Sequence, residues 1–204
     1  MGNFSDAKRE RVARQLREAG RELFARHGLQ KTTVSDLTES AGIATGTFYQ
    51  FYDSKEDLYI DLLEEESHKA YTHAISESFE TYEDPQKAIE TFLQLMMDVI
   101  ENNPLIYRLI ADDELGRLYQ YRPDDERETD REVAVAYLLP YLQEWYDEDE
   151  LVGPSTEAIA HSIRAVRLLA LHEEEIGSEH YDEVRDTIIS AIARGFTQRP
   201  TETT

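Results

Sequence analysis

The sequence predicts an all-α protein with about nine helices, and three observations support this fold class. Apolar residues recur at the spacing of one helix face through most of the 204 residues. Helix-start signals, in which a capping residue precedes a proline or a short acidic motif, stand before several of these segments. We find no stretch of alternating apolar and polar residues bounded by hairpin turns, which is the pattern of a half-buried strand.

The N-terminal part predicts one longer helix followed by two short ones. Gly28 ends the longer helix as a left-handed stop. The inward stripe of this helix consists of Val12, Leu16, Ala19 and Leu23. The motif Thr33-Val-Ser-Asp36 starts the next helix as a capping box in which Asp replaces the usual Glu. Gly42 permits the tight turn that follows, and a second short helix covers about residues 44–51.

Similar start signals divide the middle of the chain. The motif Ser54-Lys-Glu-Asp57 opens a long helix that runs toward about residue 81. Asp84-Pro85 and Asn103-Pro104 each place a capping residue before a proline in the first helical turn. These two pairs therefore start two further helices.

The last third of the chain predicts three more helices. After a polar loop at about 112–124, a helix extends to about residue 146, and Pro140 should kink it. Gly153-Pro154 opens the next helix, which Gly177 closes. The last helix follows directly.

The acidic charge lies outside the first 57 residues. The chain carries a formal net charge of −22. Residues 1–57 hold nine basic and nine acidic groups, whereas residues 58–204 hold 12 basic and 34 acidic groups. This asymmetry indicates different tasks for the two parts. Only five of the 21 basic residues are Lys, which favours a halophilic-type acidic surface, adapted to molar salt, over an ordinary acidic one.

Composition and motifs argue against several functional classes. The chain has no Cys, and its six His show no ligand spacing, so we expect neither a metal nor another cofactor. A Gly-rich phosphate loop and a nucleophile elbow are both missing, so we do not expect an enzyme. We expect no membrane partner, because no apolar run approaches the length that spans a bilayer. The polar N-terminus is no secretory signal, which favours a cytoplasmic protein.

Two short helices joined by a Gly-containing turn, after a longer helix, describe a helix-turn-helix. The second helix of such a unit lies in the major groove, with its N-terminal residues at base edges. Small and hydroxyl-bearing residues there allow close approach, and a Gln can pair with adenine. Residues at the start of neighbouring helices can meet phosphates. The predicted DNA-contacting residues are Thr33, Ala44, Thr45, Gly46, Thr47, Tyr49, Gln50 and Lys55.

Thr32-Thr33-Val34 and the run AGIATGTFYQFYDSKEDL, residues 41–58, resemble the TetR family of transcriptional regulators. Gly46, Tyr49, the aromatic residue at 52 and the Ser-Lys-Glu-Asp-Leu run stand at that family's spacing. The resemblance implies an all-α homodimer whose last two long helices pair across the dimer. It also implies a helix-turn-helix DNA-binding domain, at residues 1–53, and an effector-binding and dimerisation domain, at residues 54–204.

This sequence departs from the family at two positions, and some residues keep a second interpretation. The family often has Tyr, His or Arg at the two positions after Tyr49, where this chain has Gln50 and Phe51. Phe51 has no donor, which leaves open whether a phosphate contact common in relatives is made here. Phe48 and Tyr52 are favoured as core residues, and Gly46 is equally a packing glycine or a point of close approach. The arginines of the first helix are interpreted mainly as a solvated face, of which one or two members touch phosphates.

Aromatic and Met residues on inward faces of the second part predict a pocket for a small effector with an apolar body. The predicted pocket residues are Tyr71, Phe92, Met96, Tyr107, Tyr137, Tyr141, Trp145, His161 and Arg164. Ordinary core packing is the alternative for each aromatic residue.

Two apolar stripes near the C-terminus predict a dimer interface, because a helix that is apolar on more than one face needs more than one neighbour. The predicted interface residues are Ile159, Ile163, Val166, Ala170, Val184, Ile188 and Ile192.

The residues and the resemblance together predict a ligand-responsive transcriptional repressor. It would bind a palindromic double-stranded operator as a homodimer and be released by a small-molecule effector. The alternative is an acidic all-helical adaptor that binds other proteins. The charge-neutral first segment, with its specific turn, argues against that alternative.

Overall fold

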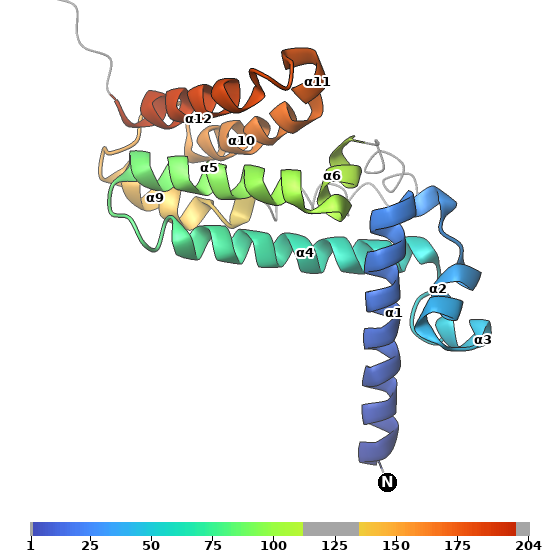
Figure 1. The fold of residues 1–204 in the computed structure, drawn as a ribbon. Helices are drawn as coiled ribbons and strands as arrows, with labels where there is room; N and C mark the ends of the chain where they lie inside the picture. Colours follow the sequence, from blue (N-terminus) through green and yellow to red (C-terminus); the bar gives the residue numbers. More distant parts are fainter. Residues whose placement is uncertain (1, 112–134, 199–204) are drawn as a thin grey trace, which may run out of the picture. The chain divides into compact units, whose positions relative to one another are not determined.

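The computed structural model describes residues 2–111 and 135–198, with side chains from 6–109 and 135–198. Every regular element in these ranges is a helix, so the predicted all-α fold class is confirmed (Figure 1). None of these helices combines the length and apolar character needed to cross a membrane. The predicted loop at 112–124 lies outside the described residues.

The chain forms two compact units. Unit 1 comprises the residues up to His68 and the segment that begins at Asn103, and unit 2 comprises Lys69–Asn102 and the described residues from 135 onward. The sequence places a domain boundary between residues 53 and 54, whereas the packing of unit 1 also includes the first turns of the following helix. The division into a DNA-binding domain up to residue 53 and an effector domain from residue 54 stays a prediction.

Unit 1 is built around one long helix and the short helices that pack on it. Its elements are α1 (Gly2–Lys31), α2 (Val34–Ala41), α3 (Thr45–Phe48), the first half of α4 (Lys55–Glu77) and α6 (Pro104–Ala111) (Figure 1). The core contains Leu16, Phe24, Leu37, Phe48, Leu58, Tyr59 and Leu62, all fully buried. Gly20 lets α4 approach α1 closely, because a Cβ there would lie 2.8 Å from Leu62 Cδ1.

Local hydrogen bonds fix the start of α2 and of α4 as the sequence predicts. The Thr33 backbone N–H donates to Asp36 Oδ2 at 2.9 Å, and the Asp36 N–H donates to Thr33 Oγ1 at 3.2 Å. Ser54 and Asp57 exchange the same pair of bonds at 3.0 and 3.1 Å. These reciprocal bonds satisfy amide groups that a helix start leaves unpaired. The prediction of two capping boxes is therefore confirmed.

A polar cluster joins three segments of unit 1. Arg17 on α1 donates two hydrogen bonds to the Asp61 carboxylate on α4, at 2.9 and 3.0 Å. The Tyr52 hydroxyl donates to the same carboxylate at 2.6 Å. Burial opposes ionisation of Asp61, but the bonds from Arg17 and Tyr52 outweigh it and hold the pKa of Asp61 below its ordinary value. Burial, with the bond to Asp61, raises the pKa of Tyr52 to about 12.

Asp61→Asn is expected to lower the free energy of unfolding by about 1–2 kcal/mol at neutral pH, because both donors lose a charged acceptor in a half-buried site. A carboxyl group with a depressed pKa stabilises the fold above its unfolded pKa, about 4. The deficit of the variant should therefore shrink as the pH falls below that value. Urea unfolding of both proteins across pH 3–7 measures it.

Glu22→Gln is the matched control for Asp61→Asn. Glu22 also pairs with an arginine of α1, Arg26, at 3.1 Å, but both side chains are more than half exposed. Such a surface pair contributes less than about 0.5 kcal/mol. Equal losses of stability in the two variants would contradict the role given to the Asp61 cluster.

Unit 2 packs the second half of α4 with the remaining helices. These are α5 (Pro85–Asn102), α9 (Leu139–Asp147), α10 (Thr156–Ala165), the 3-10 helix η1 (Val166–His172), α11 (Glu173–Ile176) and α12 (Tyr181–Thr197). α5 contacts both α12 and η1. The Arg185 guanidinium and the Tyr181 hydroxyl, both of α12, donate to the Glu101 carboxylate of α5 at 2.9 Å.

Two expected elements of unit 2 differ from the structure. Pro140 does not kink a longer helix but stands in the first turn of α9, where its missing N–H costs no helical bond. The single helix expected between Gly153-Pro154 and Gly177 is divided into α10, η1 and α11. Runs of 3-10 helix longer than three or four residues are uncommon, so the seven residues of η1 mark a change in helical geometry beside the core.

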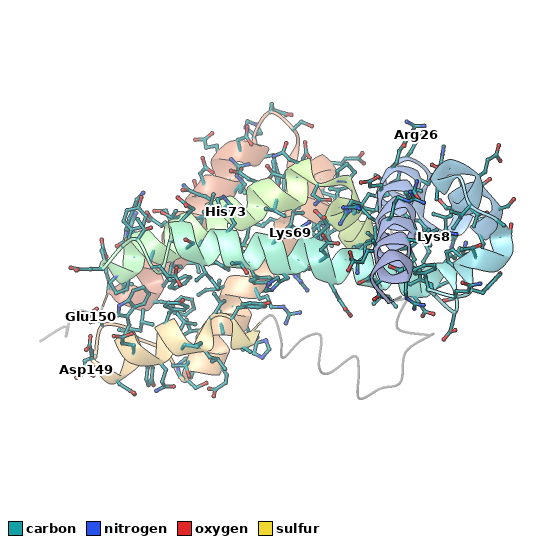
Figure 2. All side chains as sticks on the ribbon, turned by 90° about the horizontal axis from the view of Figure 1, so that it is seen from below. Lys8, Arg26, Lys69, His73, Asp149 and Glu150 are labelled. Carbon is teal, nitrogen blue, oxygen red and sulfur yellow. The ribbon has the colours of Figure 1, made fainter. Side chains whose placement is uncertain are left out.

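Helix ends in unit 2 use left-handed residues. Gly177 has a φ of 92° after α11. Asp149, which follows α9 together with Glu150, has a φ of 63° (Figure 2). Asp tolerates this conformation better than most side chains, because its short polar group bonds locally.

Candidate functional site

The turn between α2 and α3 in unit 1 has the geometry of a helix-turn-helix. Gly42 adopts a φ of 67° and a ψ of 36°, and its N–H bonds to Glu39 O at 3.1 Å. The Ile43 N–H bonds to Thr38 O at 3.0 Å. This pair of bonds is a Schellman motif, which ends α2 sharply and turns the chain into α3.

The second helix of the motif is shorter than expected. The sequence predicts a helix over about 44–51, whereas α3 covers Thr45–Phe48. The residues that follow continue as turns: the Gln50 N–H bonds to Thr47 O at 3.1 Å and the Phe51 N–H to Phe48 O at 2.9 Å. These hydrogen bonds join residues three apart, as in a 3-10 helix, and tighten the end of α3. Tyr49 and Gln50 therefore stand on the turns after α3.

The predicted DNA-contacting residues of this segment lie at the surface of unit 1. Ala44, Thr45, Gly46, Tyr49 and Gln50 are exposed, and Tyr49 keeps 57% of its surface accessible. Thr47 is half-buried. Phe48, in contrast, is fully buried, as its favoured interpretation as a core residue requires.

Gly46 is not a packing glycine within unit 1. A Cβ added to it would meet no atom within 4 Å. Its φ is not in the left-handed region, so its backbone conformation does not require glycine either. A small residue at this point therefore leaves open space on the outer side of α3, where an external surface can approach the backbone closely.

Two of the predicted contacts are already engaged within unit 1. The Thr33 hydroxyl donates to Asp36 Oδ2 at 2.7 Å as part of the cap of α2. The ammonium group of Lys55 donates to three backbone carbonyls at the end of α1, those of Leu29, Thr32 and Gln30, at 2.7, 2.8 and 3.4 Å. The donors of Lys55 are directed at these carbonyls, and its contact with DNA stays a prediction.

Arg9 of α1 lies beside the end of the motif, and the sequence interpretation did not single it out among the arginines of that helix. Its Nη2 donates to Gln50 O at 3.3 Å, and its guanidinium carbon lies 5.0 Å from the centroid of the Phe51 ring. Cations favour this position over an aromatic face. Figure 2 marks Lys8 and Arg26 on the same helix. Only the packing of α1 along the motif reveals Arg9, because 41 residues separate it from Gln50.

Unit 2 contains a small cavity of about 20 Å³, room for about one water molecule. Four predicted pocket residues line it: Tyr71, Phe92, Met96 and Arg164. The other lining residues are Leu93, Met97, Leu138, Ile163 and Arg167. Arg167 lies three residues after Arg164, and this helical spacing is the one signal in the sequence that pointed to it.

The other predicted pocket residues do not line the cavity. Tyr107 belongs to unit 1 and is 41% exposed, and His161 is exposed. Tyr141 and Trp145 instead gather around Phe79, with ring centroids 5.4 and 5.5 Å from it.

Tyr137 lies one layer behind the cavity. Its ring stacks on that of Tyr71 with centroids 5.1 Å apart. Tyr107, Tyr137, Tyr141, Trp145 and His161 thus lie outside the lining of this cavity, and their contact with an effector stays a prediction. Helical periodicity identified inward faces but not which inward residues share a layer.

One of the two stripes predicted for the dimer interface, with four of its seven residues, is buried within unit 2. Ile159, Ile163, Val166 and Ala170 are buried inside unit 2, none more than 4% exposed. An interface needs accessible side chains, so this stripe belongs to the core. Val184, Ile188 and Ile192 on α12 remain half-exposed, and Leu168 and Leu171 of η1 are 47% and 37% exposed.

Known proteins resemble the chain most closely over the helix-turn-helix. The family model of bacterial regulatory proteins of the tetR family matches residues 16–62. The HTH-type transcriptional repressor KstR2 of Rhodococcus jostii (strain RHA1) is 41% identical over 49 residues, which are 24% of each chain. The fatty acid metabolism regulator protein of Bacillus subtilis (strain 168) is 37% identical over 51 residues, 25% of this chain and 26% of that one. The matches thus span about a quarter of these relatives.

Solved structures resemble the fold over most of the chain. A TetR family transcription regulator from Marinobacter aquaeolei VT8 has a TM-score of 0.68 at 16% identity, covering 95% of this chain and all of that one. FadR from Bacillus subtilis in complex with stearoyl-CoA has a TM-score of 0.67 at 16% identity, covering 89% and 97%. Residues 16–62 thus match the tetR family of bacterial regulatory proteins, and over most of its length the chain has the fold of these solved structures.

Proposed function

We propose that the protein is a DNA-binding transcriptional regulator, a repressor that binds palindromic operator DNA as a homodimer. The observation that carries this proposal is the exposed row formed by Ala44, Thr45, Gly46, Tyr49 and Gln50, which lie on α3 and at its two ends. It combines open space at Gly46 with hydroxyl and amide groups suited to base edges and phosphates. The tetR family match over the same residues supports this proposal.

Arg9 extends the proposed interface. Phe51 has no hydrogen-bond donor, but the guanidinium of Arg9 lies over its ring and beside the Gln50 carbonyl. Arg9 therefore brings a positive charge to the position where relatives often have a polar side chain. Arginine is well suited to phosphate, because its planar donors pair with two oxygens at once.

A small-molecule effector is proposed to control DNA binding through unit 2. The cavity lined by Tyr71, Phe92, Met96 and Arg164 is the candidate site, since it combines an apolar wall with a charged group. Effector binding would favour a conformation in which the two recognition segments no longer fit successive major grooves.

The dimer is proposed to form through the half-exposed stripe of α12, with Leu168 and Leu171 of η1 adding apolar surface. Ile188→Glu is expected to yield monomers, because a charge at the centre of an apolar seam is costly to bury. Sedimentation velocity measures the change. Thr187→Glu, at the exposed neighbouring position, is the control and should stay dimeric; a dimeric Ile188→Glu would rule out this stripe.

A gel-shift titration with the DNA upstream of the chain's own coding region tests the regulator proposal. The protein should retard this DNA and not a scrambled duplex of equal composition. The specific complex should persist at molar salt, where the Debye length is about 3 Å and the acidic part of the chain is screened. An adaptor that binds other proteins would retard neither duplex at any salt concentration.

A further inference from the structure

The cavity of unit 2 contains a polar atom that the protein leaves unpaired. The lining is almost entirely apolar apart from the guanidinium groups of Arg164 and Arg167. The Nε atom of Arg164 is buried and has no hydrogen-bond partner among the described residues. Buried donors in folded proteins are almost always paired, so this exception needs an explanation.

Arg164 differs in this respect from other half-buried arginines of the chain. Arg17 pairs with Asp61, Arg21 with Glu65 and Glu66, and Arg185 with Glu101. The chain carries 43 acidic residues, roughly two for each basic one, so carboxylates are abundant. In the described part of the chain, none of them forms an ion pair with Arg164. A guanidinium beside an apolar cavity, in so acidic a protein, is suited to an anion that comes from outside.

We propose that this cavity binds an anionic amphiphile, a molecule with a carboxylate or phosphate head group and an alkyl body. The head group pairs with Arg164, while the alkyl part lies among Tyr71, Phe92 and Met96. Arg167, on the same wall, adds a second positive charge. This inference rests on the proposed effector control and specifies the chemical class of the effector.

The walls of the cavity explain how such a ligand enters a space of about 20 Å³. Met96 and Met97 line it, and the unbranched, flexible Met side chain repacks more readily than branched ones. Arg164 stands at the end of α10, and Arg167 lies in the 3-10 helix that follows. Residues in 3-10 geometry convert to α-helix by a small change in backbone angles, which moves the wall relative to the core.

Thermal unfolding of the full chain with three probes of equal length tests the proposal. The probes are decanoate and decyl phosphate, each below its critical micelle concentration, and decan-1-ol below its solubility limit; sodium acetate serves as an anion without an alkyl body. At least one decyl anion should raise the melting temperature in a saturable way, since a ligand that binds the native state stabilises it. Decan-1-ol and acetate should each bind at least about tenfold more weakly than that decyl anion. The two anionic arms distinguish a carboxylate from a phosphate head group.

Arg164→Gln should abolish the preference for the anion, and Arg164→Lys should restore part of it. Arg194→Gln, which removes an exposed arginine of α12, is the charge-matched control and should behave as the parent protein. Circular dichroism reports whether each variant folds. If Arg164→Gln does not fold, the comparison of decanoate with decan-1-ol on the parent protein still decides the question.

The proposal would be overturned by equal binding of decan-1-ol and the anions, by an anion preference that survives Arg164→Gln in a folded protein, or by binding of no probe. Stabilisation by acetate as strong as by decanoate would identify a site for small anions only and would also overturn it. A parent protein that binds its operator but ignores every probe would refute this effector class alone. A parent protein that binds probes and no DNA would refute the regulator proposal instead.

Discussion

Tyr49→Ala is expected to weaken operator binding about 100-fold while the protein stays folded. A hydrogen bond to a charged phosphate contributes about 1.5 kcal/mol or more, and a dimer loses two such bonds. Tyr49 is 57% exposed, and its ring meets the buried Phe48 only edge-on, at a centroid distance of 5.4 Å. The free energy of unfolding should therefore change by less than about 1 kcal/mol. Fluorescence anisotropy of a labelled operator duplex and urea unfolding measure the two quantities.

Tyr49→Phe separates the hydroxyl from the ring. It keeps the contact with Phe48 and removes only the proposed phosphate bond, so most of the affinity loss should remain. Tyr107→Ala is the matched control, because it removes another exposed tyrosine of unit 1 from α6. Parent-like affinity in Tyr49→Ala would exclude this residue from the interface, and an equal loss in Tyr107→Ala would show that the effect is not local.

Arg9 bears on the same measurement. The interaction of Arg9 with the Gln50 carbonyl and the Phe51 ring joins α1 to the segment that carries Tyr49. Phosphate contacts set affinity and its salt dependence, whereas contacts with base edges set sequence preference. Arg9 and Tyr49 therefore contribute to affinity in the proposed interface, while Thr45 and Gln50 contribute to the choice of operator.

Sequence patterns predicted those parts of the fold that short-range chemistry determines. The capping boxes Thr33/Asp36 and Ser54/Asp57 form between residues three apart, and the left-handed Gly42 is required by one tight turn. Each is therefore visible in a few letters of sequence. Asn103 likewise caps α6, with its side-chain oxygen accepting from the Leu105 N–H at 3.0 Å.

Features that depend on packing partners could not be predicted in the same way. Periodicity identified Ile159 and Ile163 as an inward stripe, but it does not say whether the neighbour is another helix of the same chain or of a second copy. In the structure, Ile159 and Ile163 are buried against helices of the same chain. The same periodicity placed Tyr141 and Trp145 on an inward helix face, but their rings pack against Phe79 and do not line the cavity.

Lys55→Met is expected to lower the free energy of unfolding by about 1.5–3 kcal/mol, a drop in melting temperature of roughly 4–10 °C. The Lys55 ammonium donates to the carbonyls of Leu29 and Gln30 in the last turn of α1 and of Thr32 just after it, and so ties α4 to the end of that helix. Met keeps the length of the apolar stem and removes the three donors. Differential scanning calorimetry measures the loss.

The salt dependence of operator binding then decides between the two roles of Lys55. A lysine that meets a phosphate contributes about 0.9 to the slope of log affinity against log salt, and its removal lowers that slope. If the ammonium instead holds the end of α1, Lys55→Met should leave the slope unchanged and lower the free energy of unfolding. Lys31→Met removes an exposed charge at the end of the same helix and should lower stability by less than about 0.5 kcal/mol. A reduced slope with an unchanged melting temperature would show that Lys55 contacts a DNA phosphate and would contradict its proposed role in stabilising the fold.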